Sequence, residues 1–288
     1  MGREMNHAHK QNWDKIIRPR NGWFDIHPRE LWKYRDLIGL FVWRDFVAIY
    51  KQTILGPLWY IIQPLLTTVV FTIIFGNVAR LPTDGVPPFL FYLSGVITWR
   101  YFADCLNNTA NTFVGNAHIF GKVYFPRLTV PVSVVISNLI AFGIQFLLFL
   151  AFYFYYWQNS SVIHPQPALL LLPLLIIQMA ALGLGFGIIV SSMTTRYRDL
   201  THLVGFGVQL WMFATPVVYP ASSLPDKWRW ILLLNPMAPV IEAFRYAFLG
   251  TGSINPKSWL ISLSITVCIL FVGIILFSRV EKSFMDTV

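Results

Sequence analysis

Four stretches of this 288-residue chain contain no Asp, Glu, Lys or Arg, and they constrain its fold more than any other feature. They lie between residues 51 and 80, 127 and 196, 199 and 226, and 257 and 279. A helix needs about 20 apolar residues to cross a bilayer, so the second stretch has room for two spans and each of the others for one. Only 12% of the chain is charged, about half the share of a soluble domain. The sequence therefore predicts an all-α integral membrane protein.

A further span is predicted at about residues 89–113, although this apolar segment contains Arg100, Asp104 and several asparagines. Six spans are then expected in the transmembrane domain, which we place at residues 53–288. Their predicted positions are about 54–75, 89–113, 128–157, 168–193, 200–219 and 258–278.

The segment before the first span divides into a polar tail, residues 1–26, and a helix, residues 27–52. In this helix, apolar side chains recur at the spacing of one helical face, while Lys33 and Arg35 lie on other faces. Such a helix can lie in the membrane surface, so we interpret it as an amphipathic interface helix on the cytoplasmic side. A soluble helix packed on a partner is the alternative. The apolar face consists of Leu31, Tyr34, Ile38 and Phe41.

Two shorter apolar stretches separate the fifth and sixth spans. They are Trp228–Leu234 and Met237–Leu249, and prolines interrupt them at Pro236 and Pro239. Each stretch is too short to cross a bilayer. We expect re-entrant or interfacial helices here.

The distribution of Lys and Arg predicts the orientation. The segments 1–52, 115–127, 194–199 and 279–288 together hold sixteen, whereas the segments on the opposite side hold five. Cytoplasmic loops carry the excess of positive charge, so both termini are expected in the cytoplasm. The net charge of +9 is then a consequence of topology, and nucleic acid is not an expected partner.

Catalytic and metal-binding patterns are missing from the sequence. Gly115 to Lys122 resembles a phosphate-binding loop but has one residue too many between its glycines. The histidines are scattered, and Cys105 and Cys268 both lie in apolar segments. We therefore expect no catalytic residue, no metal and no cofactor bound by this chain.

The charged pair in the second predicted span has two interpretations. Arg100 and Asp104 are four residues apart, where they can form an ion pair on one helix face. They could also face a wet interior through which a polar substrate passes. In either case, a single paired acid is a poor proton relay, because ion-driven transporters place several carboxylates in the membrane. Uphill transport would need energy from a partner.

Aromatic residues make up 16% of the chain and gather near the predicted span ends. They form either the ordinary interfacial belt or part of a conduit, because aromatic faces suit sugar rings. Gly183 and Gly187 form a G-x-x-x-G pattern that permits close helix packing. The residues favoured for a conduit are Trp59, Tyr60, Trp99, Arg100, Tyr101, Asp104 and Asn108.

From about residue 29 onward, the sequence resembles the ABC-2 type permeases, the transmembrane subunits that export O-antigen, teichoic acid and related lipid-linked polysaccharides. The resemblance rests on several segments in a fixed order. They include Tyr50–Trp59 (YKQTILGPLW), Asn116–Arg127 (NAHIFGKVYFPR), Arg196–Asp199 (RYRD), Thr215–Pro220 (TPVVYP) and Glu242–Arg245 (EAFR).

The resemblance implies a homodimer in the bacterial inner membrane, bound to two copies of an ATPase subunit that holds ATP and Mg²⁺. It implies a lateral opening between spans 1 and 5 for the lipid anchor, and periplasmic re-entrant helices that include Glu242 and Arg245. It also implies that the cytoplasmic loop after span 2 is a coupling helix. The predicted coupling residues are Asn116, His118, Ile119, Phe120, Lys122 and Tyr124.

The function expected from these observations is export of a lipid-linked polysaccharide, with O-antigen favoured over teichoic acid, capsule, lipid or drug. We further expect Ile119 and Phe120 to insert into a groove of the ATPase, the alternative being insertion into the lipid interface. A membrane acyl- or glycosyltransferase is a rival of another class, for which the sequence offers no constellation of acids and histidines.

Overall fold

The computed structural model describes residues 28–52, 54–120, 125–159, 163–194, 197, 199–252 and 254–284. The predicted polar tail, Lys122 and Tyr124 lie outside these residues, and so does the side chain of His118. The described residues form helices and connecting turns without any strand, which confirms the all-α class.

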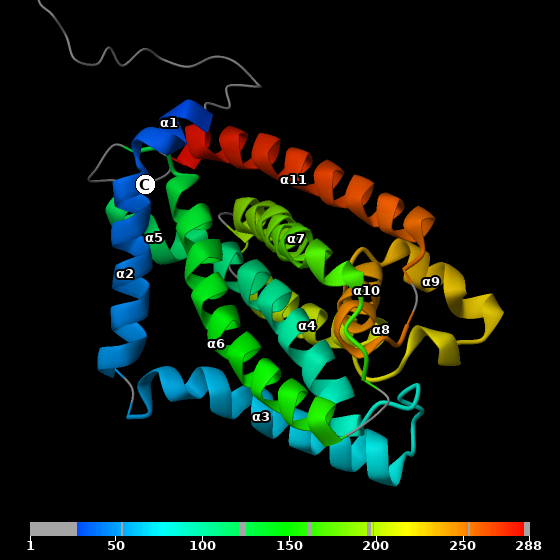
Figure 1. Ribbon diagram of the computed structural model, residues 1–288. Helices are drawn as coiled ribbons and strands as arrows, with labels where there is room; N and C mark the ends of the chain where they lie inside the picture. The colour runs from blue at the N-terminus through cyan, green and yellow to red at the C-terminus, as the bar shows by residue number, and fades with distance from the viewer. Residues whose placement is uncertain are drawn as a thin grey trace, which may run out of the picture.

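The predicted helix 27–52 is divided in two. α1 (Pro28–Lys33) and α2 (Arg35–Gln52) are separated by a turn at Tyr34, whose N–H donates to the carbonyl of Leu31. α2 packs along α6 (Thr129–Asn159); in Figure 1, α2 lies on the left and α6 runs from beside it toward the lower centre. The interface helix is therefore held by the transmembrane helices of its own chain.

Helix α4 (Pro88–Ala110) lies at the centre of the bundle. It contacts α3 (Trp59–Phe71), α6, α7 (Leu172–Thr194), α8 (Leu200–Ala214) and α10 (Ala238–Leu249). Most of its side chains are buried. This position explains how α4 tolerates polar residues, because neighbouring helices rather than lipid surround it.

The described part of the chain contains four helices that are long and apolar enough to cross a membrane. The first is continuous from η1 (Gly56–Leu58) through α3 (Trp59–Phe71) to the π-helical η2 (Thr72–Val78). The others are α6, the helix formed by η3 (Pro167–Leu171) with α7 (Leu172–Thr194), and α11 (Pro256–Phe284).

The two remaining predicted spans differ from these four. α4 is long enough, but it contains Arg100, Asp104 and two asparagines, Asn107 and Asn108. α8 (Leu200–Ala214) is apolar but has only 15 residues and is about 22 Å long, less than the roughly 30 Å of a hydrocarbon core. It ends before the predicted residue 219 because Pro216 disfavours a helical conformation at Thr215, whose φ of −105° and ψ of 146° are extended.

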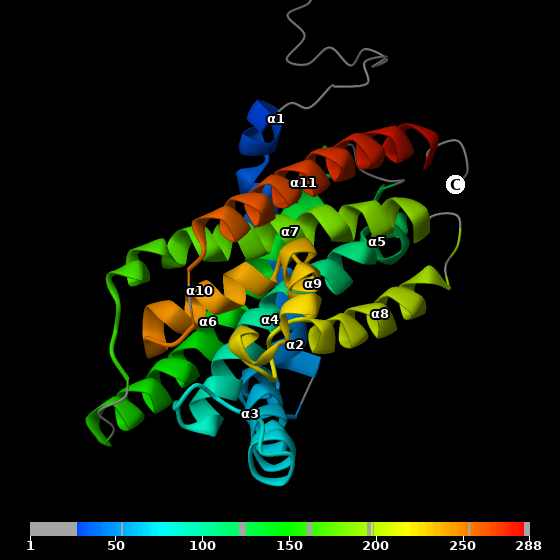
Figure 2. The same cartoon turned by 90° about the vertical axis from the view of Figure 1, so that its right-hand side faces the viewer.

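Helix α7 lies between α4 and α11 in both views (Figures 1 and 2). A Cβ atom at Gly183 would lie 2.5 Å from Cys105 Cβ, and one at Gly187 would lie 2.5 Å from Thr109 Cβ. Only glycine permits this approach, so the predicted role of the G-x-x-x-G pattern in close packing is confirmed for α4 and α7.

Different helices lie at the two ends of the molecule. In Figure 1, α1, α2 and α5 (Thr112–Phe120) lie on the left, and α9 (Arg229–Leu234) and α10 (Ala238–Leu249) on the right. α9 and α10 correspond to the two short apolar stretches.

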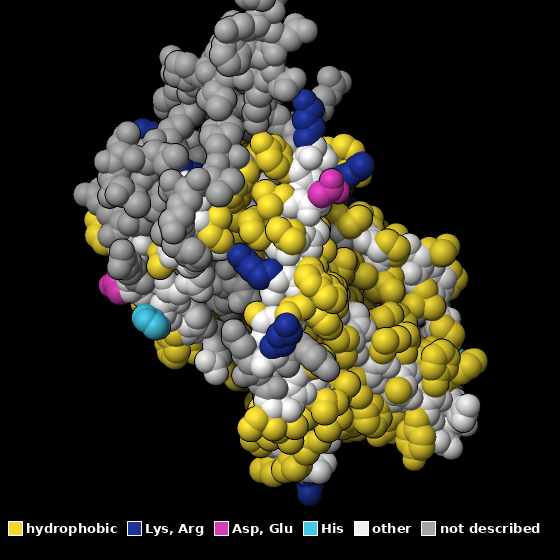
Figure 3. Space-filling model, turned by 90° about the vertical axis from the view of Figure 1, so that its left-hand side faces the viewer, with side chains coloured by type: hydrophobic (Ala, Val, Ile, Leu, Met, Phe, Trp, Pro, Cys, Tyr) yellow, Lys and Arg dark blue, Asp and Glu magenta, His cyan; other side chains and the backbone are white. Residues whose placement is uncertain are grey.

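The face that carries α1 and α2 shows scattered Lys and Arg among broad hydrophobic areas (Figure 3). Exposed apolar side chains on several helices, Leu66, Leu147, Leu203 and Val267 among them, are typical of a lipid-facing surface.

Candidate functional site

A line of polar side chains crosses α3, α4 and α6, and we call it the polar strip. Arg100, Asp104 and Asn108 recur every four residues and therefore share one face of α4. Arg100 Nε lies 3.4 Å from Asp104 Oδ2, and Arg100 Nη2 donates to Gln63 Oε1 on α3. Asn108 Nδ2 donates to Asn138 Oδ1 on α6 over 3.1 Å. The predicted Arg100–Asp104 pair is thus formed.

The polar strip is also open on one side. The side chain of Arg100 is 27% exposed and that of Asp104 is 38% exposed. Apolar residues such as Trp59 and Leu66 are exposed on the neighbouring α3. Charged groups in such surroundings need water, a polar ligand or another protein surface, so the strip is the best candidate in the described residues for a polar path.

The aromatic residues predicted for the conduit divide into two groups. Trp59 is exposed and Tyr60 is half-buried. Trp99 and Tyr101 lie in the packed interior, with ring centroids 5.9 Å from Trp211 and 5.0 Å from Phe142, respectively. The expectation that they line a conduit is therefore not met.

The reason lies in helix geometry. Trp99 and Tyr101 flank Arg100, and adjacent residues on an α-helix are rotated by about 100°. Both rings consequently turn away from the face that carries Arg100.

Five phenylalanines at the other end of α4 form what we call the aromatic cluster. Phe113 and Phe120 of α5 have ring centroids 5.9 Å apart, and Phe113 stacks on Phe277 of α11 at 4.6 Å. Phe125 lies 5.8 Å from both Phe120 and Phe41 of α2. The cluster thereby joins α2, α5 and α11.

The predicted coupling segment, residues 116–124, contributes Phe120 to this cluster, and Ile119 packs against it. Phe120 is only 2% exposed, and the Arg127 guanidinium lies 5.4 Å from its ring. The expectation that Phe120 inserts into a partner is therefore wrong for this structure, because its own chain encloses the ring. Ile119 is half-buried against the same cluster. Asn116 lies at a kink in α5, and its Nδ2 donates to the Thr112 carbonyl.

The predicted apolar face of the interface helix is turned toward the protein. Three of its residues are half-buried and the fourth is buried, whereas Trp32 and Trp43 on other faces are largely exposed. The exposed tryptophans suit a membrane interface. The inward residues are Leu31, Tyr34, Ile38 and Phe41.

At the opposite end, Arg245 of α10 is buried among backbone carbonyls, and we call this the arginine junction. Its Nη1 donates to the carbonyl of Pro216 at 2.5 Å, and its Nη2 donates to that of Val217 at 2.7 Å. Its Nη2 also donates to the Phe91 carbonyl at 3.4 Å, and its Nε to Ser94 Oγ at 3.4 Å. One side chain thus connects α10, the segment after α8, and α4.

Glu242 lies one turn before Arg245. Its Oε1 is 3.9 Å from Arg245 Nη1 and accepts the backbone N–H of Ala221 at 3.4 Å. The two residues of the predicted re-entrant region are therefore paired, and the pair ties α10 to the loop before α9.

Several residues of these sites were not selected from the sequence. Gln63 and Asn138 are polar residues within apolar runs, a signal that could have singled them out. Phe113 and Phe277 carry no such signal, because phenylalanine is common throughout this chain.

Helices of membrane length, a surface rich in exposed apolar side chains and a partly open polar strip define a multi-pass membrane protein. Residues 36–249 match the family model for the ABC-2 type transporter. The match covers more than half of the chain, and the protein belongs to this family.

Relatives of known name have similar lengths. The chain is 31% identical over 256 residues to an O-antigen export system permease protein RfbA of Klebsiella pneumoniae, covering 87% of this chain and 94% of the relative. It is 28% identical over 262 residues to the protein of the same name from Myxococcus xanthus, covering 90% and 98%. It is 24% identical over 250 residues to the polysialic acid transport protein KpsM of Escherichia coli, covering 85% and 93%.

Proposed function

We propose that this chain is the transmembrane permease subunit of an ATP-driven exporter of lipid-linked polysaccharide, with O-antigen as the favoured cargo. The observation that carries the proposal is the polar strip, a partly exposed row of hydrogen-bonding groups on a surface otherwise suited to lipid. The names of the relatives in Klebsiella pneumoniae and Myxococcus xanthus agree with O-antigen. The name of the Escherichia coli relative, polysialic acid transport protein KpsM, supports another polysaccharide as the alternative cargo.

The polar strip suits a glycan chemically. Sugar hydroxyls both donate and accept hydrogen bonds, and the strip offers a guanidinium, a carboxylate and three amides. Trp59 and Tyr60 add aromatic surface beside it. Arg100 and Asp104 neutralise each other, so the strip attracts neither anions nor cations strongly.

The proposed assembly is a homodimer with two copies of an ATPase subunit. A second copy of the chain would face the open side of the strip and complete a conduit. ATP and Mg²⁺ would be bound by the ATPase, and this chain would bind no cofactor. Membership of the ABC-2 family supports this arrangement.

Coupling would pass through the aromatic cluster. A push on α5 would reach α2 through Phe125 and Phe41, and α11 through Phe113 and Phe277. Asn116, His118, Ile119, Lys122 and Tyr124 remain the proposed contact residues for the ATPase. Phe120 would support these contact residues from the aromatic cluster in the protein interior.

The proposed topology has six spans, with α4 and α8 included, re-entrant α9 and α10, and both termini in the cytoplasm of the bacterial cell. The test is a reporter that is active only outside the cytoplasm. It should be active after Val86 or near Gln158 and inactive after Arg198 or at Val288. Activity at Val288 would contradict the even number of spans.

The function is tested by deleting the gene and restoring it with variants. Arg100→Leu/Asp104→Leu removes both charges together, which avoids an unpaired charge. We expect a large loss of surface polysaccharide, accumulation of lipid-linked glycan inside the cell, and an unchanged amount of permease. Ser264→Ala, at an exposed polar residue of α11, is the matched control. Normal surface polysaccharide in the deletion strain would refute the proposal.

The energy source is tested by purification. The chain should co-purify with a nucleotide-binding subunit and should not hydrolyse ATP alone. Hydrolysis by the isolated chain above the level of contaminants would contradict a separate ATPase.

A further inference from the structure

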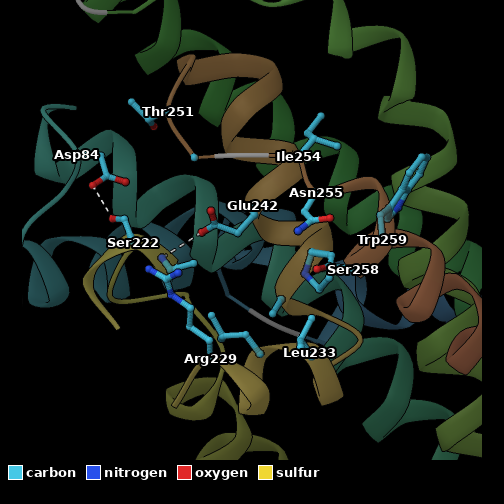
Figure 4. A pocket seen from close by; sticks show the side chains of 15 residues that line it. Asp84, Ser222, Arg229, Leu233, Glu242, Thr251, Ile254, Asn255, Ser258 and Trp259 are labelled. Atoms are coloured by element: carbon cyan, nitrogen blue, oxygen red, sulfur yellow. Dashed lines mark hydrogen bonds between the residues drawn. The ribbon is translucent and has the colours of Figure 1, made fainter. Parts of the chain in front are cut away.

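A cavity of about 690 Å³ opens where α9, α10 and the start of α11 meet the loops around Asp84 and Ser222 (Figure 4). Its volume lies in the range of ligand pockets. It is separate from the polar strip, and Glu242 alone among the predicted site residues contributes to its lining.

One wall of the cavity is the indole of Trp259 at the start of α11. Its Nε1 donates to Gln178 Oε1 at 2.9 Å, and Gln178 Nε2 donates to Ser262 Oγ at 2.7 Å. Ser262 Oγ in turn donates to the Pro236 carbonyl at 2.5 Å. This chain of hydrogen bonds fixes the ring from its edge, so its face is a preorganised apolar surface.

The rest of the lining mixes hydrogen-bonding groups with apolar ones. Glu242 reaches the cavity from α10, and Asp84 accepts a hydrogen bond from Ser222 at 2.9 Å (Figure 4). Thr251 Oγ1 is buried and makes no hydrogen bond to any described residue. Because this oxygen is inaccessible to solvent, it lies beneath the cavity surface, and the exposed side chain of Asn255 adds the hydrogen-bonding group on this part of the lining.

The charges of the lining indicate which ligand fits. The lining contains the carboxylates of Asp84 and Glu242 and the cation Arg229, and the buried Arg245 pairs with Glu242 from below. These charges nearly balance, so the cavity favours a neutral ligand over a phosphate. A neutral sugar offers hydroxyl donors to these carboxylates, hydroxyl acceptors to Arg229 and Asn255, and an apolar ring face to Trp259.

We propose that this cavity binds a neutral sugar unit of the exported glycan on the outer side of the membrane. The assignment of the glycan and of the side rests on the proposed function. The fit of a neutral sugar to the cavity rests on the lining alone.

The test uses the intact permease–ATPase complex in lipid nanodiscs and saturation-transfer NMR. The probes are the methyl glycosides of glucose, galactose, mannose and N-acetylglucosamine, with sn-glycerol 1-phosphate as the anionic comparison. At least one glycoside should bind, and more tightly than the phosphate does. Absence of binding by all four glycosides, or tighter binding of the phosphate, would overturn the proposal.

Three variants locate the binding. Ser258→Ala removes a hydroxyl from a residue of the lining and should weaken glycoside binding about three- to tenfold without lowering thermal stability. Trp259→Phe should weaken binding to a similar degree. Trp157→Phe, at an exposed tryptophan of α6 outside the lining, is the control and should change nothing. Equal binding by all three variants would place the sugar elsewhere.

The export assay separates this inference from the proposed function. If deletion of the gene abolishes surface polysaccharide but no glycoside binds, the inference fails alone. If deletion leaves polysaccharide export normal, the proposed function fails whatever the cavity binds.

Discussion

The aromatic cluster and the arginine junction each join three parts of the chain, but by different means. The cluster uses stacked and tilted rings from α2, α5, α11 and Phe125, with contacts that can slide and repack. The junction uses one guanidinium with directed hydrogen bonds to three carbonyls and one hydroxyl. Dispersion contacts are lost gradually as groups move apart, whereas a buried charge that loses its partners is costly at once. The cluster therefore suits a region that moves, and the junction suits one that must keep its geometry.

Replacing the arginine should have the largest effect. Arg245→Met keeps much of the side-chain volume but removes the donor to the carbonyls of Pro216 and Val217 and the cation that pairs with Glu242. We expect a loss of roughly 3–5 kcal/mol of stability, measured by thermal unfolding of the purified protein in detergent. Lys257→Met, at an exposed cation near the start of α11, is the control. Similar unfolding temperatures for the two variants would show that the junction does not hold this end together.

The stability of the aromatic cluster should fall with the amount of side-chain volume that a substitution removes. Phe120→Ala removes a buried ring and should cost about 3 kcal/mol, whereas Phe120→Leu keeps apolar volume and should cost about 1 kcal/mol. Unfolding temperature and surface polysaccharide, measured for the same two variants, should fall in the same order. An equal and severe loss in both would mean that the ring is needed for a specific contact, and the contrast with the junction would disappear.

The arginine junction also leaves little room for a side chain at position 95. A Cβ at position 95 would lie 2.7 Å from Arg245 Nη2 and 2.9 Å from the Val217 carbonyl. We expect Gly95→Ala to cost about 1–3 kcal/mol, as overpacking does. Gly143→Ala on α6 has nothing within 4 Å and should be neutral or slightly stabilising, because alanine favours a helix. Equal unfolding temperatures for both variants would show that α4 can shift away from Arg245.

The smallest effect on stability is expected at Ile119. The side chain is half-buried at the edge of the cluster, so Ile119→Ala should cost about 1 kcal/mol or less. It should still reduce co-purification of the ATPase if this residue contacts the partner. Normal co-purification of Ile119→Ala, together with a loss in Phe120→Ala, would assign the coupling role to the cluster's shape rather than to its exposed edge.

Local sequence determined much of this protein. Long charge-free runs can only be membrane helices or a large core, and they predicted α6 and α7 to within a few residues, whereas α11 continues six residues beyond its predicted end at residue 278. The prolines around residues 236 and 239 separated α9 from α10, and the four-residue spacing of Arg100 and Asp104 predicted their pair. These features depend on the chain within a few turns, where apolar runs, proline and helical periodicity are sufficient.

Tertiary packing decided the rest. The sequence states that Trp99, Arg100 and Tyr101 are adjacent, but only the positions of α6 and α8 determine which of them is enclosed. Phe120 was expected to face a partner and instead meets Phe113 and Phe125. Arg245 appeared as one charge in a short helix, and its carbonyl partners come from segments about 30 and 150 residues away. The periodicity of a helix defines the angles between its side chains, whereas the face that is buried depends on which helices pack against it.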